Sequence, residues 1–257
     1  MHSLFLIQLT CRSFFETADP EGGSHGPQLS QKGNRMDNRD ASRLGGLPET
    51  EICFRFLKNG EALSDENALA LSRLVYDTDP YIYPAMFGSR ENAEALLPLL
   101  FGSNDSMFCL SNCYVAEREG AIIGLLLWKQ GALTWSPALL KRLAAERGIP
   151  LSPYLDMVSE EYVSVYEQLP EEDVLSLINL CVVKELCGRG IGRKILENFF
   201  AQKPAAVYEL CALKDNSGAV HLYTSLGFEI CEEYNGFSVD HRRLPALRMR
   251  RSGSHEQ

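Results

Sequence analysis

Residues 173–192 read DVLSLINLCVVKELCGRGIG, and this stretch decides the fold. Apolar residues form a nearly continuous run from Val174 to Val183, in which Ser176 and Asn179 are the polar positions. Such a run is typical of a strand that is covered on both faces. Glycines follow at positions 188, 190 and 192, and an apolar helical pattern begins at Ile191. The stretch therefore predicts a buried strand, a glycine-rich turn and a helix.

The glycine turn is suited to binding an anion. Glycine has no Cβ, so the backbone can approach a phosphate closely, and it accepts backbone conformations that other residues avoid. The N-terminus of the following helix would direct its unpaired N–H groups and its positive dipole end to the same place. We therefore expect this turn to bind a ligand that carries a diphosphate.

Two familiar nucleotide motifs do not match this turn. A Walker A loop would need Gly-Lys-Ser/Thr beginning five residues after Gly188, but that position is Arg193 and Lys194 is followed by Ile195. The third glycine of a dinucleotide fingerprint would also fall on Arg193. Glu209 stands where such a domain places its ribose-binding acid, yet the chain ends too soon for the further strands and helices required. A turn that merely joins strand to helix is the third alternative.

The next segment repeats the order of strand and helix. AVYELCAL at 206–213 predicts a second apolar strand, and SGAVHLYTSLGF at 217–228 predicts a helix preceded by Asn216. Four residues of this helix share one face at helical spacing: Ala219, Leu222, Tyr223 and Leu226. Gly227 is placed as a left-handed C-terminal cap, and Phe228 can fold back on the last turn.

Strand, glycine turn, helix, strand and an Asn-led helix ending in Leu-Gly-Phe together resemble the GNAT superfamily of acyl-CoA-dependent N-acyltransferases. The resemblance covers about residues 113–235, and its strongest motifs lie between 178 and 228. It implies an α+β fold, the GNAT fold, with a mixed central sheet of about six to seven strands flanked by helices. It also implies acetyl-CoA as cosubstrate and an amine as acceptor.

The resemblance carries specific roles to residues of this chain. The strand segment around Cys181 would pair with the pantetheine arm by strand addition, and the turn would hold the pyrophosphate. The cofactor-binding residues that it implies are Leu180, Cys181, Val182, Cys187, Gly188, Arg189, Gly190, Ile191, Gly192, Arg193 and Asn216. Cys187 departs from the family pattern, which has Arg or Gln there, but main-chain amides would hold the anion. For catalysis it implies Tyr223 as the acid that protonates the leaving thiolate and the N–H around Val182 as the oxyanion donor.

The general base is open at this stage. Relatives that acetylate protein N-termini have a glutamate five residues before the asparagine, and this chain has Cys211 there. Glu209 lies two residues earlier and thus on the same strand face, so it is the candidate base, acting through water. A cross-strand or solvent role for Glu209 is the alternative. Cys211 itself is expected to be a small buried residue rather than a nucleophile.

The rest of the chain completes one domain. We expect a disordered leader at 1–48, an acyltransferase domain at 49–251 with a helical insertion at 135–170, and a tail at 252–257. The predicted strands and helices outside the motif region are a strand at 51–58, a helix at 65–76, a helix at 90–101, a hairpin at 113–118 and 121–129, a strand from 229 and a last edge strand at 247–250. The aromatic segment 79–87 has two prolines, so we expect no regular helix there; it either packs as a loop or lines the acceptor pocket. The insertion is either a lid or an extra packing layer.

Composition narrows the function classes. A formal net charge of −9 argues against a nucleic-acid surface, and no apolar run is long enough for a membrane helix. The eight cysteines form no C-x-x-C pair, which is typical of reduced thiols in a cytoplasmic protein. The five histidines lack spacing for a metal site, so we expect no metal. The sequence does not indicate the oligomeric state.

Two function classes follow. The first is an N-acetyltransferase that moves the acetyl group of acetyl-CoA to a primary amine of a small molecule or protein, by direct attack in a ternary complex; ribosomal-protein-type N-terminal acetylation is its protein-directed variant. The second is a non-catalytic module that binds acyl-CoA. Tyr223 favours the enzyme.

Overall fold

The computed structural model describes residues 51–131, 136–159, 174–239 and 242–253. They form a mixed sheet of seven strands in the order β1-β2-β3-β4-β5-β7-β6. The strands are β1 Cys53–Phe56, β2 Cys113–Arg118, β3 Ala121–Gln130, β4 Val174–Val182, β5 Val207–Leu213, β6 Glu229–Val239 and β7 Arg242–Ser252. Neighbouring strands are antiparallel except β4 and β5, which are parallel. The α+β class and the strand number are as predicted.

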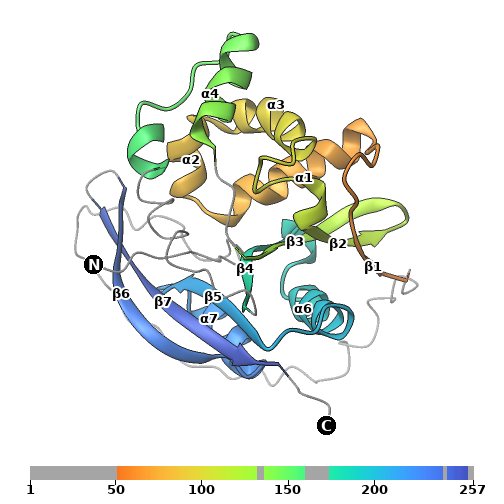
Figure 1. Ribbon diagram of the computed structural model, residues 1–257. Helices are drawn as coiled ribbons and strands as arrows, with labels where there is room; N and C mark the ends of the chain where they lie inside the picture. The colour runs from red at the N-terminus through yellow and green to blue at the C-terminus, as the bar shows by residue number, and fades with distance from the viewer. Residues whose placement is uncertain (1–50, 132–135, 160–173, 240–241, 254–257) are drawn as a thin grey trace, which may run out of the picture.

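Helices cover both faces of the sheet (Figure 1). They are α1 Asp65–Thr78, α2 Ile82–Phe87, α3 Arg90–Phe101, α4 Pro137–Glu146, α6 Ile191–Gln202 and α7 Ser217–Ser225, with short 3-10 turns η1 Leu110–Asn112 and η2 Lys184–Leu186. The group α1 to α4 lies on one side, and α6 and α7 lie on the other. We call these the α1–α4 face and the α6–α7 face.

Serine side chains cap the N-termini of the first two long helices. Ser64 accepts a hydrogen bond from the N–H of Asn67 at 3.2 Å, and Ser89 accepts one from Asn92 at 3.2 Å. Each bond satisfies an N–H that the helix itself cannot pair. The predicted helices at 65–76 and 90–101 are thus confirmed.

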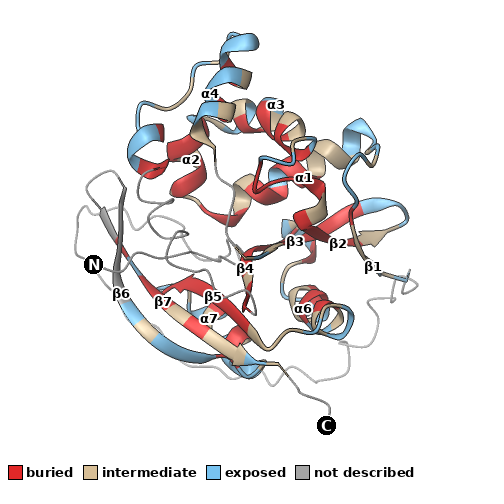
Figure 2. Ribbon diagram, in the orientation of Figure 1, coloured by how far each residue is buried: buried red, intermediate tan, exposed pale blue. Residues whose placement is uncertain are grey.

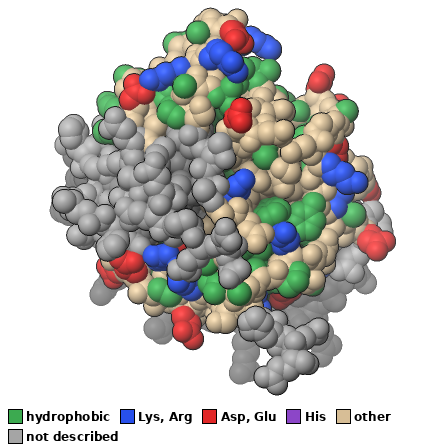
Figure 3. Space-filling view, viewed as in Figure 1, with side chains coloured by type: hydrophobic (Ala, Val, Ile, Leu, Met, Phe, Trp, Pro, Cys, Tyr) green, Lys and Arg blue, Asp and Glu red, His purple; other side chains and the backbone are tan. Residues whose placement is uncertain are grey.

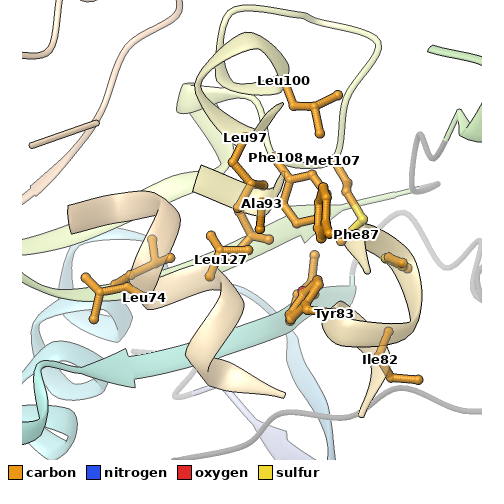
Figure 4. Packing of buried hydrophobic residues seen from close by; sticks show 14 of the residues in the cluster. Leu74, Ile82, Tyr83, Phe87, Ala93, Leu97, Leu100, Met107, Phe108 and Leu127 are labelled. Carbon is orange, nitrogen blue, oxygen red and sulfur yellow. The ribbon is translucent and has the colours of Figure 1, made fainter. Parts of the chain in front are cut away.

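Each face of the sheet has its own core. On the α1–α4 face, Tyr83, Phe87 and Phe108 stack beside aliphatic residues of α1, α3 and β3 (Figure 4). On the α6–α7 face, Phe199 of α6 packs among aromatic rings from β1, β2 and β3. Figure 2 shows that the buried residues follow the inner sides of the helices and the central strands.

Gly124 of β3 lets α6 approach the sheet. A Cβ at this position would lie 2.7 Å from Cδ1 of Ile195 and 3.3 Å from the carbonyl oxygen of Cys181. A larger residue would therefore push α6 away from the sheet. This close contact positions the N-terminus of α6 relative to β4.

The prediction that segment 79–87 contains no regular helix was wrong. The chain forms α2 over Ile82–Phe87, with Pro84 as its third residue. The first N–H groups of a helix have no partner within it, so a proline in the first turn removes no hydrogen bond. The segment is a short, largely buried helix against α3.

The prediction of an edge strand at 247–250 was also wrong. The last strand β7 runs from Arg242 to Ser252 and lies between β5 and β6, so β6 is the edge. Pairing on both sides accounts for its alternation: Leu247 and Met249 enter the α6–α7 core, while Arg248 and Arg250 point to the other face.

Part of the predicted insertion is a packing layer. Leu140 and Ala144 of α4 are buried in the core of the α1–α4 face, and residues 155–159 form a further helical turn. The rest of the second predicted helix, at 160–173, lies outside the described residues, as do the leader at 1–48 and most of the tail.

Candidate functional site

The two parallel strands separate partway along their length. They pair at three positions, from Val174 opposite Val207 to Ser176 opposite Glu209. Beyond this point β4 continues to Val182 and β5 to Leu213 without pairing to each other in the described structure. The facing strand edges therefore carry main-chain groups that no ladder satisfies.

The N–H of Val182 points to this opening. The N–H of Val183 donates to the carbonyl of Ile123 in β3 at 2.9 Å. Successive residues of a strand direct their N–H groups to opposite edges, so the N–H of Val182 faces the β5 side. The N–H of Leu180 faces the same side for the same reason. The predicted segment 180–182 thus presents main-chain groups to the space between the separated strands.

The glycine turn is open to solvent. Gly188 and Gly190 have φ angles of 74° and 76°, which only glycine adopts without strain. A Cβ at either position would meet nothing within 4 Å, and residues 188–190 are exposed. No side chain of the described residues packs this turn shut.

Helix α6 begins at Ile191 directly after the turn, with Gly190 as its N-cap and no side-chain cap. Its first main-chain bond runs from the N–H of Lys194 to the carbonyl of Gly190 at 3.0 Å. The N–H groups of residues 191–193 therefore have no partner within the helix. Together with the turn they form a cradle of donors suited to a diphosphate.

Side chains around the turn brace it. The thiol of Cys187 lies 3.5 Å from the carbonyl oxygen of Val182 and 3.6 Å from that of Val183. Arg193 bonds to Ser225 of α7 and lies 3.4 Å from Glu197. Arg189 is exposed. Cys187 thus closes the turn onto the strand end, and Arg193 ties the two helices of the α6–α7 face together.

Helix α7 positions the two residues that the resemblance singled out on it. Asn216 is the N-cap, and its Oδ1 accepts from the N–H of Ala219 at 3.1 Å. Gly227 follows the helix with φ 86°, as the predicted left-handed cap. The ring of Phe228 folds back on Tyr223, with centroids 5.8 Å apart.

The Tyr223 hydroxyl is buried without a hydrogen-bond partner among the described residues. The side chain is fully buried in the core of the α6–α7 face, which also contains Val182 and Ala212 from the separated parts of β4 and β5. Burial raises the pKa of this hydroxyl well above its ordinary value, so it keeps its proton. An unpaired buried donor costs free energy unless a ligand satisfies it.

Glu209 does not lie beside the thioester segment. It is 3% exposed, and its Oε2 accepts from Nη2 of Arg248 at 2.7 Å and from Nε of Arg250. It pairs with Ser176, six residues before Val182, which is about 20 Å along the strand. Cys211 lies on the same face, opposite Arg248. Glu209 thus has the geometry of a cross-strand ion pair with β7.

Three buried polar residues of the α1–α4 face were not predicted as site residues from the sequence. The Tyr83 hydroxyl donates to Oδ1 of Asn179 in β4 at 2.8 Å. Asp79, which precedes α2, is 2% exposed and accepts the N–H groups of Tyr81 and Ile82 at 2.7 Å each. Asn179 was visible as a polar residue within an apolar strand; Asp79 gave no such signal.

The part of the chain that the structure describes contains neither a cluster of potential metal ligands nor a helix that could span a membrane. These residues contain no group of three potential metal ligands of the His, Cys, Asp or Glu type. Among them, no helix has the length and apolarity needed to cross a membrane. Charged side chains are scattered over the face seen in Figure 3.

Comparisons with known proteins agree with this architecture. Residues 155–230 match the family model of the acetyltransferase (GNAT) domain. A crystal structure described as an acetyltransferase is 20% identical, with a TM-score of 0.51 over 79% of this chain and 100% of its own. An N-acetyltransferase from Staphylococcus aureus Mu50 is 14% identical, with a TM-score of 0.51 over 76% and 99%. A search of curated proteins found no match.

The matched stretch contains β4, the glycine turn, α6, β5 and α7, and the two structures share the fold. Residues 155–230 thus match the GNAT acetyltransferase domain, a family whose members use acetyl-CoA, and the described residues have the fold of the two acetyltransferase structures.

Proposed function

We propose that the protein is an N-acetyltransferase that transfers the acetyl group of acetyl-CoA to a primary amine, of a small molecule or a protein, by direct attack in a ternary complex. The observation that carries this proposal is the buried hydroxyl of Tyr223, which has no hydrogen-bond partner among the described residues and belongs to the same core as Val182 and Ala212 of the separated strands. A buried proton donor without a partner supports its role as the acid for a leaving thiolate.

The described residues fit acetyl-CoA. The open turn at Gly188 and Gly190 and the amides of residues 191–193 supply unpaired donors for the pyrophosphate. The β4 edge at 180–182 offers main-chain groups to the two amides of a pantetheine arm. Asn216 and Arg189 flank these elements. Two unsatisfied features, the strand edges and the helix N-terminus, are thereby explained by one ligand.

The chemistry needs two groups from the chain. Acetyl-CoA, when bound, supplies a thioester carbonyl for attack by the amine. The N–H of Val182 stabilises the negative charge that develops on the carbonyl oxygen. Tyr223 gives its proton to the thiolate as the carbon–sulfur bond breaks, which suits a hydroxyl whose raised pKa keeps it protonated.

Glu209 is omitted as the base of this proposal. Its carboxylate is engaged by two guanidinium groups and lies far along the strand from Val182. Its ion pairs instead fix β7 against β5. Proton loss from the amine is assigned to solvent. We place the protein in the cytoplasm on the basis of its cysteine usage.

Two measurements test the function. Isothermal titration should show acetyl-CoA binding to the full chain, and a thiol-release assay over a panel of amines and peptides should show turnover with at least one acceptor. Binding without turnover across the panel would instead support a non-catalytic acyl-CoA module. Absence of binding would overturn both.

A further inference from the structure

The main chain and the side chain of Arg193 belong to different parts of the α6–α7 face. Arg193 is the third residue of α6, so its N–H is one of the donors proposed for the pyrophosphate. Its guanidinium donates through Nη2 to Oγ of Ser225, the last residue of α7. Both helices lie on the same side of the sheet (Figure 1). One residue therefore contributes to the cosubstrate cradle and contacts the helix that carries Tyr223.

The contact with Ser225 continues to the residue before Tyr223. The Ser225 hydroxyl donates its own proton to the carbonyl of Leu222 at 2.6 Å. Its lone pairs are thus left to accept from Arg193, and successive bonds of this kind polarise one another. The same carbonyl accepts the N–H of Leu226 at 3.2 Å. A chain of hydrogen bonds therefore runs from the guanidinium to the peptide group that joins Leu222 to Tyr223.

The charge of Arg193 also suits the end of α7. The C-terminus of a helix carries a partial negative charge, so a cation placed there is stabilising. Helix α7 has no basic residue in its own last turn, and the cation comes instead from α6. Helix α6 has no acidic residue in its first turn, so its positive end is left for a bound anion. The two helix ends are thus electrostatically complementary to Arg193 and to a diphosphate.

The two helices differ in how the sheet holds the ends that Arg193 connects. On α6, Ile195 follows Arg193 by two residues, is fully buried and packs against Gly124 of β3. On α7 the buried residues are Ala219 and Tyr223, whereas Ser225 at the end of the helix is exposed. The C-terminal end of α7 therefore depends more on contacts with its neighbours, among them the one from Arg193.

We propose that Arg193 is a positioning residue that couples the cosubstrate cradle to the proton donor, because it sets the place of the Tyr223 hydroxyl through Ser225 and Leu222. A diphosphate bound at the start of α6 would fix the main chain of Arg193, and the guanidinium would then fix the end of α7. The side chain of Arg193 contributes to kcat and little to affinity, although the sequence placed this residue among those that bind the cofactor. The inference rests on the proposed function, in which Tyr223 is the acid.

Two substitutions break the chain of hydrogen bonds at different points. Arg193→Met keeps an unbranched side chain without the guanidinium, and Ser225→Ala removes the hydroxyl. Each should lower kcat about fivefold in the thiol-release assay with the best amine of the panel, and the double variant should lose no more than either one. The Kd for acetyl-CoA should change less than about threefold in isothermal titration, because main-chain groups hold the diphosphate. Glu197→Gln is the matched control, since it removes the other partner of Arg193 at 3.4 Å, and kcat should stay within about twofold.

A double-variant measurement asks whether Arg193 acts through Tyr223. In the Tyr223→Phe background, Arg193→Met should change kcat less than about twofold, because the group that it positions is already gone. An undiminished loss in that background would overturn the positioning role. A loss of acetyl-CoA affinity above about tenfold in Arg193→Met, with Ser225→Ala unaffected, would show that the side chain binds the cosubstrate and would also overturn it.

Amide hydrogen exchange provides a readout that needs no turnover. The amides of residues 226–228 close the end of α7, and in the free chain they should exchange about fivefold faster in Arg193→Met and Ser225→Ala, while those of α6 stay within about twofold. Unchanged exchange in both variants would overturn the coupling and leave the acetyltransferase intact.

The same readout separates this inference from the function beneath it. If the wild-type chain turns over no amine, the proposed function fails. The coupling of the two helices then stands if CoA slows exchange at residues 226–228 in the wild type and not in Arg193→Met, and it fails otherwise. If Arg193→Met does not fold, Ser225→Ala decides.

Discussion

The two faces of the sheet differ in the kind of polar group that they carry. On the α6–α7 face the groups suited to ligand binding are mainly main-chain amides, at β4, the glycine turn and the start of α6, with Tyr223 as the added side chain. On the α1–α4 face the buried polar groups are side chains that pair with one another, such as Tyr83 with Asn179 and Glu209 with Arg248. Main-chain recognition depends on backbone conformation and tolerates many sequences, whereas side-chain recognition selects particular residues. The α6–α7 face therefore suits a cosubstrate that is recognised through the main chain.

The largest expected effect concerns the one catalytic side chain proposed on the α6–α7 face. Tyr223→Phe removes the proton donor without changing the ring, so kcat should fall at least about 100-fold, the usual minimum for losing an acid catalyst. The Kd for acetyl-CoA should change less than threefold in isothermal titration, because main-chain groups hold the cosubstrate. Equal losses in kcat and affinity, or no loss in either, would contradict the division between catalysis and binding on this face.

The second prediction concerns the buried carboxylate of the other face. Burial raises the pKa of Asp79 from 3.8 to about 6, against the lowering effect of its two main-chain bonds. Between about pH 4 and pH 6 the folded chain therefore holds a proton that the unfolded chain has lost, so this residue makes the free energy of unfolding fall as pH rises. The full change is about 3 kcal/mol.

Asp79→Asn should remove this component. Relative to wild type, the variant should gain stability as pH rises from 4 to 6, measured by urea unfolding at several pH values. Parallel curves for the two chains would show that Asp79 ionises as it does in water and is not desolvated.

A third test compares two glycines with the same backbone conformation. Gly190 and Gly60 have φ angles of 76° and 75°, and a Cβ added at either position would meet nothing within 4 Å. Alanine in the left-handed region costs about 1–2 kcal/mol at either site. Both variants should lose similar stability, but only Gly190→Ala should weaken acetyl-CoA binding, by about tenfold. Similar affinity for acetyl-CoA in the two variants would contradict the proposal that this turn binds the pyrophosphate.

The smallest effect is expected at Cys187, the departure from the family pattern. Its thiol contacts with the carbonyls of Val182 and Val183 are long, at 3.5 and 3.6 Å, and thiols are weak donors. Cys187→Ala should change the Kd for acetyl-CoA less than threefold in isothermal titration. A loss greater than tenfold would show that a side chain, rather than the main chain, governs recognition on this face.

The order of strands and helices was predictable because local patterns encode it. The apolar run before Val183, the glycines at 188 and 190, and the cap at Gly227 each act within one segment. The prediction for segment 79–87 was wrong because the effect of a proline depends on its position in a helix. The sequence did not show that α2 begins at Ile82, which puts Pro84 in the first turn. The prediction of an edge strand at 247–250 was wrong because the apolar residues of a strand do not indicate which strands lie beside it.

The sequence by itself determined the strand, turn and helix that suit a diphosphate, and the placement of Tyr223 on the following helix, since neighbouring residues produce these features. Only the tertiary structure decided which residues meet across the chain. Tyr83 and Asn179 are 96 positions apart, and Glu209 meets arginines 39 and 41 positions away. Such contacts depend on how helices and strands pack, which no short-range pattern records. The buried polar pairs of the α1–α4 face are therefore a product of the fold.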